Sequence, residues 1–193
     1  AIAAQEHTKI LYPPQIVTLG TLPEHLYVAK LPFASDLVQQ LAWMRALQQT
    51  STAELSQLVP SPPAKSATQA WLELAKILSG LHRELASDQL NFLQVVEVMG
   101  AHAEAPRWKT LASIQAKYLA TLDAQRLWDI QTARLCALEF REVTSEKQLI
   151  VVGCVDLNRT QRGFLQQIAD RTQVWIAAPE SSAQLFDDFG GLS

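Results

Sequence analysis

The chain has 193 residues, of which 48% are hydrophobic and 18% charged, and its formal net charge is −3. This length allows one domain, or one domain with an insertion, and the apolar share is sufficient for a buried core. The acidic balance argues against a self-sufficient nucleic-acid binder, which usually presents a basic face. No apolar run approaches the roughly 18 residues that span a membrane, and no signal-peptide pattern is present.

Two cysteines, Cys136 and Cys154, lie in apolar contexts and lack metal-ligand spacing. They are expected to be reduced core residues of a cytoplasmic protein. The chain opens on Ala-Ile-Ala-Ala without a methionine and closes on Gly-Gly-Leu-Ser. We interpret it as a piece of a longer protein.

The first 34 residues predict one strand and one short helix. Residues 15–19 form a short β-prone run that Gly20 ends. Thr21 is expected to cap a helix that runs to about residue 27, with Glu24 at the spacing of a capping box. This part is expected to join the same sheet as the strands near the end of the chain.

From residue 35 to about residue 140 the pattern predicts helices only. Ser66 and Gln69 have capping-box spacing ahead of the strongest amphipathic pattern, and Pro106 is placed to open a helix in its first turn. Helical segments are expected at residues 35–48, 52–59, 66–85, 88–100, 106–122 and 127–138. A long helical insertion between strands of one sheet usually serves function.

The stretch from residue 148 to residue 180 predicts a βαβ unit. Residues 149–155 are a continuous apolar run of the kind found in parallel strands that are buried on both faces, and residues 174–178 form a second such run. Between them Asn158 or Thr160 can cap a helix. The crossover of such a unit is expected to be right-handed.

Asp156 lies at the carboxyl end of the first of these strands, where open α/β sheets bind their ligands. One interpretation is a Walker B carboxylate, which holds Mg²⁺ beside the phosphates of a nucleotide. Under this interpretation Asp156 is both the candidate catalytic residue and the candidate metal ligand. The alternative is an aspartate that merely ends a strand and caps the following turn.

Other site motifs are weak or missing. None of the seven glycines forms a phosphate loop, so no cofactor-binding residue can be named. His82 and Glu84 imitate the H-x-E of zinc deaminases, but no P-C-x-x-C follows, and the two side chains point to different faces of a helix. Arg159 and Arg162 follow Asp156 and could face phosphate, but a solvated helix face is the more common arrangement for such residues.

The order of these pieces resembles the helicase-like first domain of the AddB/RecB-type helicase–nucleases, which also belong to the PD-(D/E)XK nuclease family. Residues 13–23 look like the strand and turn after a Walker A unit, and residues 149–156 look like a Walker B strand. Residues 33–40 and 127–134 resemble stretches that flank a helical insert, and residues 176–180 resemble the next core strand.

The resemblance implies an incomplete RecA-like α/β fold, a parallel sheet interrupted by a large all-helical insertion. Residues 1–34 and 146–193 would form the discontinuous α/β part, and residues 35–145 the helical insertion. It implies ATP and Mg²⁺ as cofactors of the full-length protein only, with none expected for this piece alone. It also implies DNA repair, DNA as a partner in the full-length context, a possible partner helicase or nuclease subunit, and no membrane.

Two departures from the family pattern bear on activity. A Walker A segment would lie upstream of residue 1, so the piece alone is expected to be inactive. Leu157 stands where an active helicase usually has the glutamate that orients the attacking water. A non-catalytic, helicase-like scaffold that binds DNA or a partner subunit therefore remains the main alternative. An unrelated small α/β enzyme with Asp156 in a strand-end pocket is a third possibility.

Overall fold

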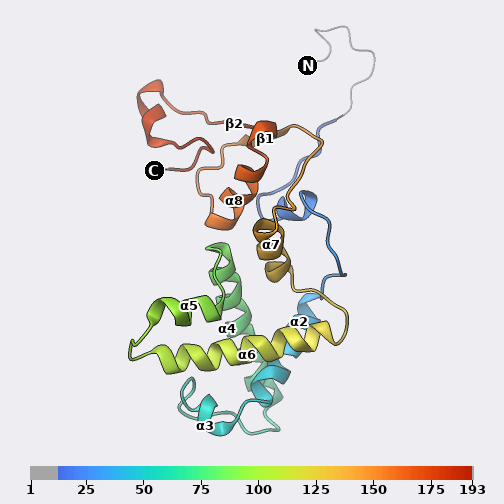
Figure 1. Ribbon diagram of the computed structural model, residues 1–193, viewed down its shortest axis with the longest axis vertical. Coiled ribbons are helices and arrows are strands. Elements are labelled where there is room, and N and C mark those ends of the chain that lie inside the picture. Colours follow the sequence, from blue (N-terminus) through green and yellow to red (C-terminus); the bar gives the residue numbers. More distant parts are fainter. Residues whose placement is uncertain (1–12, 193) are drawn as a thin grey trace.

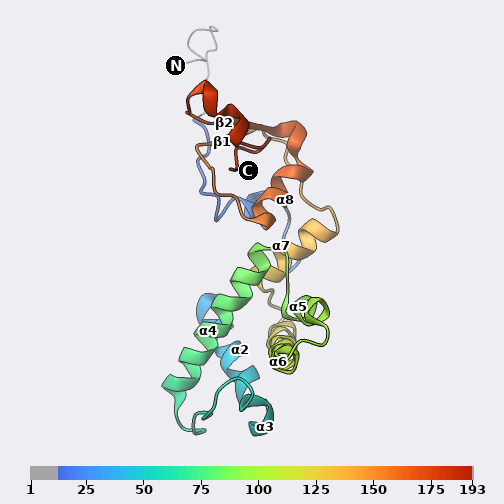
Figure 2. The ribbon, with the colours of Figure 1, turned by 90° about the vertical axis from the view of Figure 1, so that its left-hand side faces the viewer.

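The structure, a computed structural model, describes residues 13–192 of the chain. It is a mixed α/β molecule that is mostly helical, with a small parallel sheet of two strands. In Figure 1 the sheet and α8 lie at one end of the long axis, the helices α2 to α6 lie at the other, and α7 lies between them. Figure 2 shows the same separation from the side.

Helices make up the middle of the chain, as predicted. Their bounds are α2 (Asp36–Gln48), α3 (Thr52–Leu55), α4 (Thr68–Ser87), α5 (Phe92–Met99), α6 (Ala105–Asp123) and α7 (Ile130–Glu139). No helix among residues 13–192 is both long and apolar enough to cross a membrane.

Several helix starts follow local capping chemistry. The Ser35 hydroxyl accepts the Val38 N–H at the start of α2, and Pro106 lies in the first turn of α6, as expected. The prediction that a helix starts at Asp88 was wrong, because Asn91 and Gln94 form a capping box that starts α5 three residues later.

The predicted capping box of Ser66 and Gln69 does not form, and α4 begins at Thr68 without a side-chain cap. The indole N–H of Trp71 donates to the carbonyl of Ala64 at 3.0 Å. This bond fixes the chain ahead of the helix in place of a cap. The helix is therefore held at its start by packing, since Trp71 is only 3% exposed.

The helices α2, α4, α5 and α6 enclose the first hydrophobic core. Trp43 of α2 is fully buried at its centre and stacks on Tyr118 of α6, with ring centroids 4.0 Å apart and an interplanar angle of 9°. Phe92 of α5 packs edge-on against Trp43. Large aromatic side chains bury much apolar area, so this cluster dominates the packing of the helices.

The sheet consists of β1 (Leu149–Val152) and β2 (Thr172–Trp175), which pair in parallel with Leu149 opposite Thr172. The helix α8 (Arg159–Gln167) and a 3-10 turn, η2 (Ala169–Arg171), connect them, so the predicted βαβ order is confirmed. The first strand is shorter than predicted, and the second is shifted toward the N-terminus of the chain. The first ends at Val152 because Gly153 adopts a φ of +65°, and the second begins and ends earlier than residues 174–178.

Residues 15–19 do not form the predicted strand. Their contacts to the α/β part run through side chains: Lys147 Nζ lies 3.0 Å from Gln15 Oε1, and Gln161 donates to the carbonyl of Leu19. A strand needs a backbone ladder to a neighbour, and this segment forms none with β1. The predicted helix after Thr21 is only a 3-10 turn, η1 (Pro23–His25).

The second core lies under the sheet. Val151 of β1 and Phe164 and Leu165 of α8 are buried there together with Leu22 and Leu26 from the N-terminal segment. Ala133 and Ala137 of α7 pack into this core rather than into the helical one, although α7 was expected in the helical insertion. Beyond β2 the chain forms a 3-10 helix, η3 (Glu180–Leu185).

Candidate functional site

Asp156 lies beyond the carboxyl end of β1, in the segment that joins the strand to α8. Gly153 turns the chain away from the sheet, and its N–H still donates to the carbonyl of Trp175 at 2.9 Å. The side chain of Asp156 is exposed, whereas the next residue, Leu157, is 8% exposed and belongs to the core under the sheet. The carboxylate can therefore reach a ligand in solvent, and Leu157 cannot.

The start of α8 is held by two contacts. Asn158 caps the helix and forms a capping box with Gln161, which decides between the two predicted caps. Thr160 is buried, and its hydroxyl donates instead to the carbonyl of Ala86 at the end of α4, at 2.5 Å. The segment that carries Asp156 is thus tied directly to the helical part.

The two arginines after Asp156 have different environments. Arg162 forms an ion pair with Asp187, whose Oδ1 also accepts the N–H groups of Phe189 and Gly191 at 2.9 Å. A side chain at Gly191 would collide with the guanidinium of Arg162, at 2.5 Å. The charge of Arg162 is therefore neutralised by Asp187, and the exposed Arg159 is the arginine that remains available to an anion.

The arrangement of donor atoms limits which metal site this region can form. Within residues 13–192 no group of three His, Cys, Asp or Glu side chains converges to hold an ion. Mg²⁺ sites at nucleotides commonly use one or two protein carboxylates and complete the shell with phosphate oxygens and water. The single exposed carboxylate of Asp156 fits a site of that kind and does not fit an all-protein metal cage.

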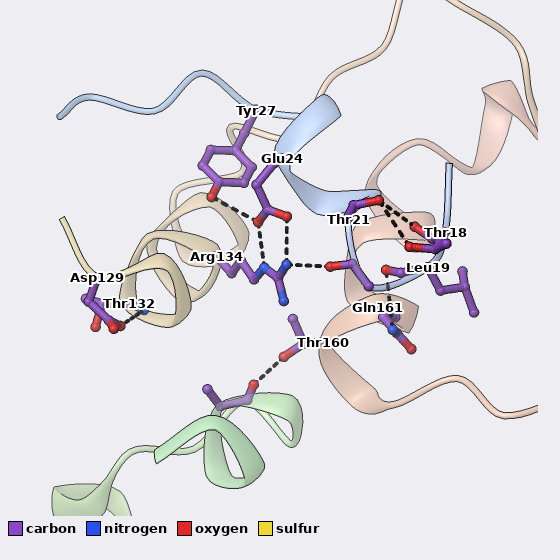
Figure 3. Close-up of polar contacts among 12 residues, drawn as sticks. Thr18, Leu19, Thr21, Glu24, Tyr27, Asp129, Thr132, Arg134, Thr160 and Gln161 are labelled. Carbon is purple, nitrogen blue, oxygen red and sulfur yellow. Dashed lines mark hydrogen bonds and ion pairs between the residues drawn. The ribbon is translucent and has the colours of Figure 1, made fainter. Parts of the chain in front are cut away.

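An ion pair joins the N-terminal segment to α7 (Figure 3). Arg134 donates through two nitrogens to the two carboxylate oxygens of Glu24, each at 2.6 Å, and also to the carbonyl of Gly20 at 2.7 Å. Burial and the neighbouring Glu24 carboxylate raise the pKa of Tyr27, whose hydroxyl faces that carboxylate. Glu24 therefore does not form the capping box predicted with Thr21.

A buried polar network lies where α7 meets the helical core. The Asp129 carboxylate is 1% exposed and accepts from His82 Nε2 at 2.9 Å, from the Tyr118 hydroxyl at 2.8 Å and from the Thr132 N–H at 2.7 Å. Burial alone would raise the pKa of Asp129, but the hydrogen bonds from His82, the Thr132 N–H and Tyr118 hold it below its usual value. The same burial and the Asp129 charge raise the pKa of Tyr118.

The hydrogen bonds of Gln115 fix the state of His82. The Phe92 N–H donates to Gln115 Oε1 at 3.3 Å, which turns the amide NH₂ of Gln115 toward His82 Nδ1 at 3.0 Å. Nδ1 therefore accepts, and Nε2 carries the proton that it donates to Asp129. Both ring nitrogens are used inside the protein, so His82 serves the packing of α4 against α6 and α7.

The sequence patterns did not identify either polar cluster. Glu24 and Arg134 are 110 positions apart, and His82 and Asp129 are 47 apart, so no local spacing links them. The one local signal was Asp129 directly before an apolar helical segment, a typical N-cap position.

Comparisons of the chain with protein-family models, with curated proteins and with solved structures found no match.

Proposed function

We propose that this chain is part of a cytoplasmic, ATP-dependent DNA-processing protein of the helicase–nuclease type. In this proposal the β1–α8–β2 unit belongs to a RecA-like ATPase domain, and the helical middle of the chain is an insertion that faces DNA. The full-length protein would act in DNA repair and could work with a partner helicase or nuclease subunit. The observation that carries the proposal is the exposed carboxylate of Asp156 just beyond the carboxyl end of a parallel strand.

In this mechanism Asp156 would hold Mg²⁺, and the ion would neutralise charge at the phosphates of ATP. The exposed Arg159 lies three positions further along the chain and can contribute positive charge to the same ligand. The segment is positioned by the Asn158 cap and by the hydrogen bond between Thr160 and Ala86. This bond ends on α4, so the segment that carries Asp156 contacts the helical part directly.

A second function, a scaffold that binds DNA or a partner subunit without using ATP, is favoured by a separate observation. Leu157 is buried in the core, so this position cannot orient an attacking water as a glutamate would. The charge of Arg162 is neutralised by Asp187, so this arginine is not available to a phosphate. The two functions differ in whether the Asp156 carboxylate matters for activity.

The test is ATP hydrolysis by the full-length protein that contains this chain, with and without single-stranded DNA. Replacing Asp156 by Ala should lower DNA-stimulated hydrolysis by about 100-fold, a common cost of removing a group that stabilises developing charge. The matched control is Asp170→Ala, because Asp170 is an exposed aspartate that precedes the amino end of β2. If the unmodified protein hydrolyses no ATP, the motor is excluded and the scaffold is supported.

A further inference from the structure

A groove with a volume of about 800 Å³ separates the two parts of the molecule. One wall is the turn after α4 and the start of α5, and the other walls are α7 with its following turn and α8. Figure 1 shows these elements converging at the middle of the long axis. Amide side chains are prominent in the lining, namely those of Gln89, Asn91, Gln94, Gln166 and Gln167.

The packing on one side of the groove requires a residue without a side chain at position 163, which is Gly163. A Cβ at this position would lie 2.7 Å from Gln89 Nε2 and 3.3 Å from the side chain of Leu138. Gln89 has a φ of +59°, and its amide donates to the carbonyl of Arg159 in the first turn of α8, at 2.9 Å. A non-glycine residue at positive φ is uncommon and is retained where surrounding contacts hold it. The amide of Gln89 thus links the turn after α4, in the helical part, to α8 in the α/β part.

The amides of this groove leave hydrogen-bonding groups of both kinds for a ligand. Asn91 and Gln94 use their side-chain oxygens to accept each other's backbone N–H, which leaves their NH₂ groups to donate elsewhere. Gln167 donates to the carbonyl of Leu138 at 2.8 Å, and its buried Oε1 has no hydrogen-bond partner among residues 13–192. That oxygen is shielded from solvent, so the acceptor open to a ligand is the amide oxygen of the exposed Gln166, which also carries an NH₂ donor.

The charge and composition of the lining narrow the class of ligand. The charged lining residues, Glu139 and Arg141, are of opposite sign, and no aromatic side chain is among the lining residues. Single-stranded nucleic acids are usually bound by a basic track and by aromatic stacking platforms, and the groove provides neither. An extended polypeptide has the matching chemistry, because its backbone alternates N–H donors and C=O acceptors and carries no charge.

We propose that this groove binds an extended, uncharged polypeptide segment of a partner protein, whose backbone hydrogen-bonds to the glutamine and asparagine side chains. The volume lies within the range of ligand-binding clefts and holds a short segment rather than a folded domain. The segment would contact α5, α7 and α8 together and would hold the two parts of the molecule in one arrangement. This binding is independent of whether the protein hydrolyses ATP.

The experiment selects binders from a display library of random 12-residue peptides, with the 193-residue chain as bait. Selected peptides are synthesised and titrated into ¹⁵N-labelled chain, and the side-chain NH₂ resonances of glutamine and asparagine are followed by NMR. Uncharged peptides are expected to shift the resonances of Gln94 and Asn91. The exchange of Gln166 for Trp should weaken their binding at least about tenfold by filling the groove, a loss typical of a disrupted contact residue.

The matched control is Gln48→Trp, the same exchange at an exposed position of α2 outside the groove lining, which should leave binding unchanged. Melting curves verify that both variants fold, and Gln166→Lys serves as a second block if the Trp variant does not. The proposal is overturned if no peptide is selected or if the peptides bind the Gln166 variants as tightly as the unmodified chain. It is also overturned if a 12-nucleotide oligothymidylate, and not a peptide, shifts the groove resonances.

Discussion

At the scale of single residues, Asp129 has the largest structural consequence. Its carboxylate accepts hydrogen bonds from three helices: from His82 of α4, from Tyr118 of α6 and from the Thr132 N–H at the start of α7. Removing a buried acceptor leaves these donors without partners in an apolar surrounding. The side chain therefore fixes how α7 leaves the helical core, and through α7 it fixes the path to the α/β part.

This arrangement predicts a specific dependence of stability on pH. The pKa of Asp129 is lower in the folded chain than in the unfolded chain, where an aspartate titrates near about 3.9. The contribution is therefore fully present above that value and is lost as the pH falls through the folded pKa. Urea unfolding between pH 7 and pH 2 should show this loss in the unmodified chain and a smaller acid loss in Asp129→Asn.

Asp123→Asn provides the control for this measurement, because Asp123 is an exposed aspartate at the end of α6. Its removal should leave the pH dependence unchanged. At pH 7, Asp129→Asn should lower the free energy of unfolding by about 2 kcal/mol, the order found when buried donors lose a charged hydrogen-bond acceptor. Equal acid sensitivity of all three chains would show that the network does not control stability.

At the scale of elements, the bidentate pair of Arg134 and Glu24 attaches the N-terminal segment to α7. Their side chains are 17% and 21% exposed, so solvent screens the pair only partly. Bidentate geometry strengthens such a pair and holds both side chains in one orientation. The pair thus replaces the backbone pairing that residues 15–19 do not make with the sheet.

A double-mutant cycle tests this attachment. The changes Glu24→Gln and Arg134→Met should show a coupling energy of about 1–2 kcal/mol, above the median of exposed pairs because of the partial burial and the two hydrogen bonds. The pair of Lys30 and Glu142 is the comparison, since its side chains are 57% and 33% exposed. Equal coupling in both cycles would contradict a special role for the Arg134 pair.

The elements also show what sequence patterns could predict. The helix start near residue 35, a cap at Asn158 or Thr160 and the order strand, helix, strand are local properties, and they were predicted from local chemistry. The strand at residues 15–19 was predicted from composition, but a strand exists only when a neighbour completes its ladder. The Glu24–Arg134 pair and the His82–Asp129 pair depend on distant segments meeting, and no spacing in the sequence encodes that.

The same distinction applies to the candidate site. Asp156 was found because an acidic residue after an apolar run is a local pattern, and the structure leaves its carboxylate exposed just beyond the strand end. The burial of Leu157 and the pairing of Arg162 with Asp187 could not be predicted, because both depend on the fold of the surrounding core and of the C-terminal segment. These two findings bear most directly on the choice between a motor and a scaffold.

At the scale of the whole molecule, two hydrophobic cores are joined by few contacts. The helix α7 is one connection between them. Two hydrogen bonds form another: Thr160 donates to the carbonyl of Ala86 at the end of α4, and Gln89, just after α4, donates to the carbonyl of Arg159 in α8. Parts connected in this way can open separately, because each core retains its own packing. The relative placement of the two parts therefore depends on a small number of polar bonds beside the groove.

The change Thr160→Val tests this dependence, since it keeps the shape of the side chain and removes the hydroxyl that bonds to Ala86. The free energy of local opening of α8 should fall by about 1 kcal/mol, the net worth of one hydrogen bond, because the Ala86 carbonyl still accepts the Gln89 N–H at 3.1 Å. Amide hydrogen exchange should then become faster in α8 and β1, while α6 stays as protected as before, because α6 belongs to the other core. Thr68→Val, at an exposed position in the first turn of α4, should change neither region. Uniformly faster exchange through α6 and α8 would instead mean that the two cores unfold as one cooperative unit, and that the groove between them is as rigid as either core.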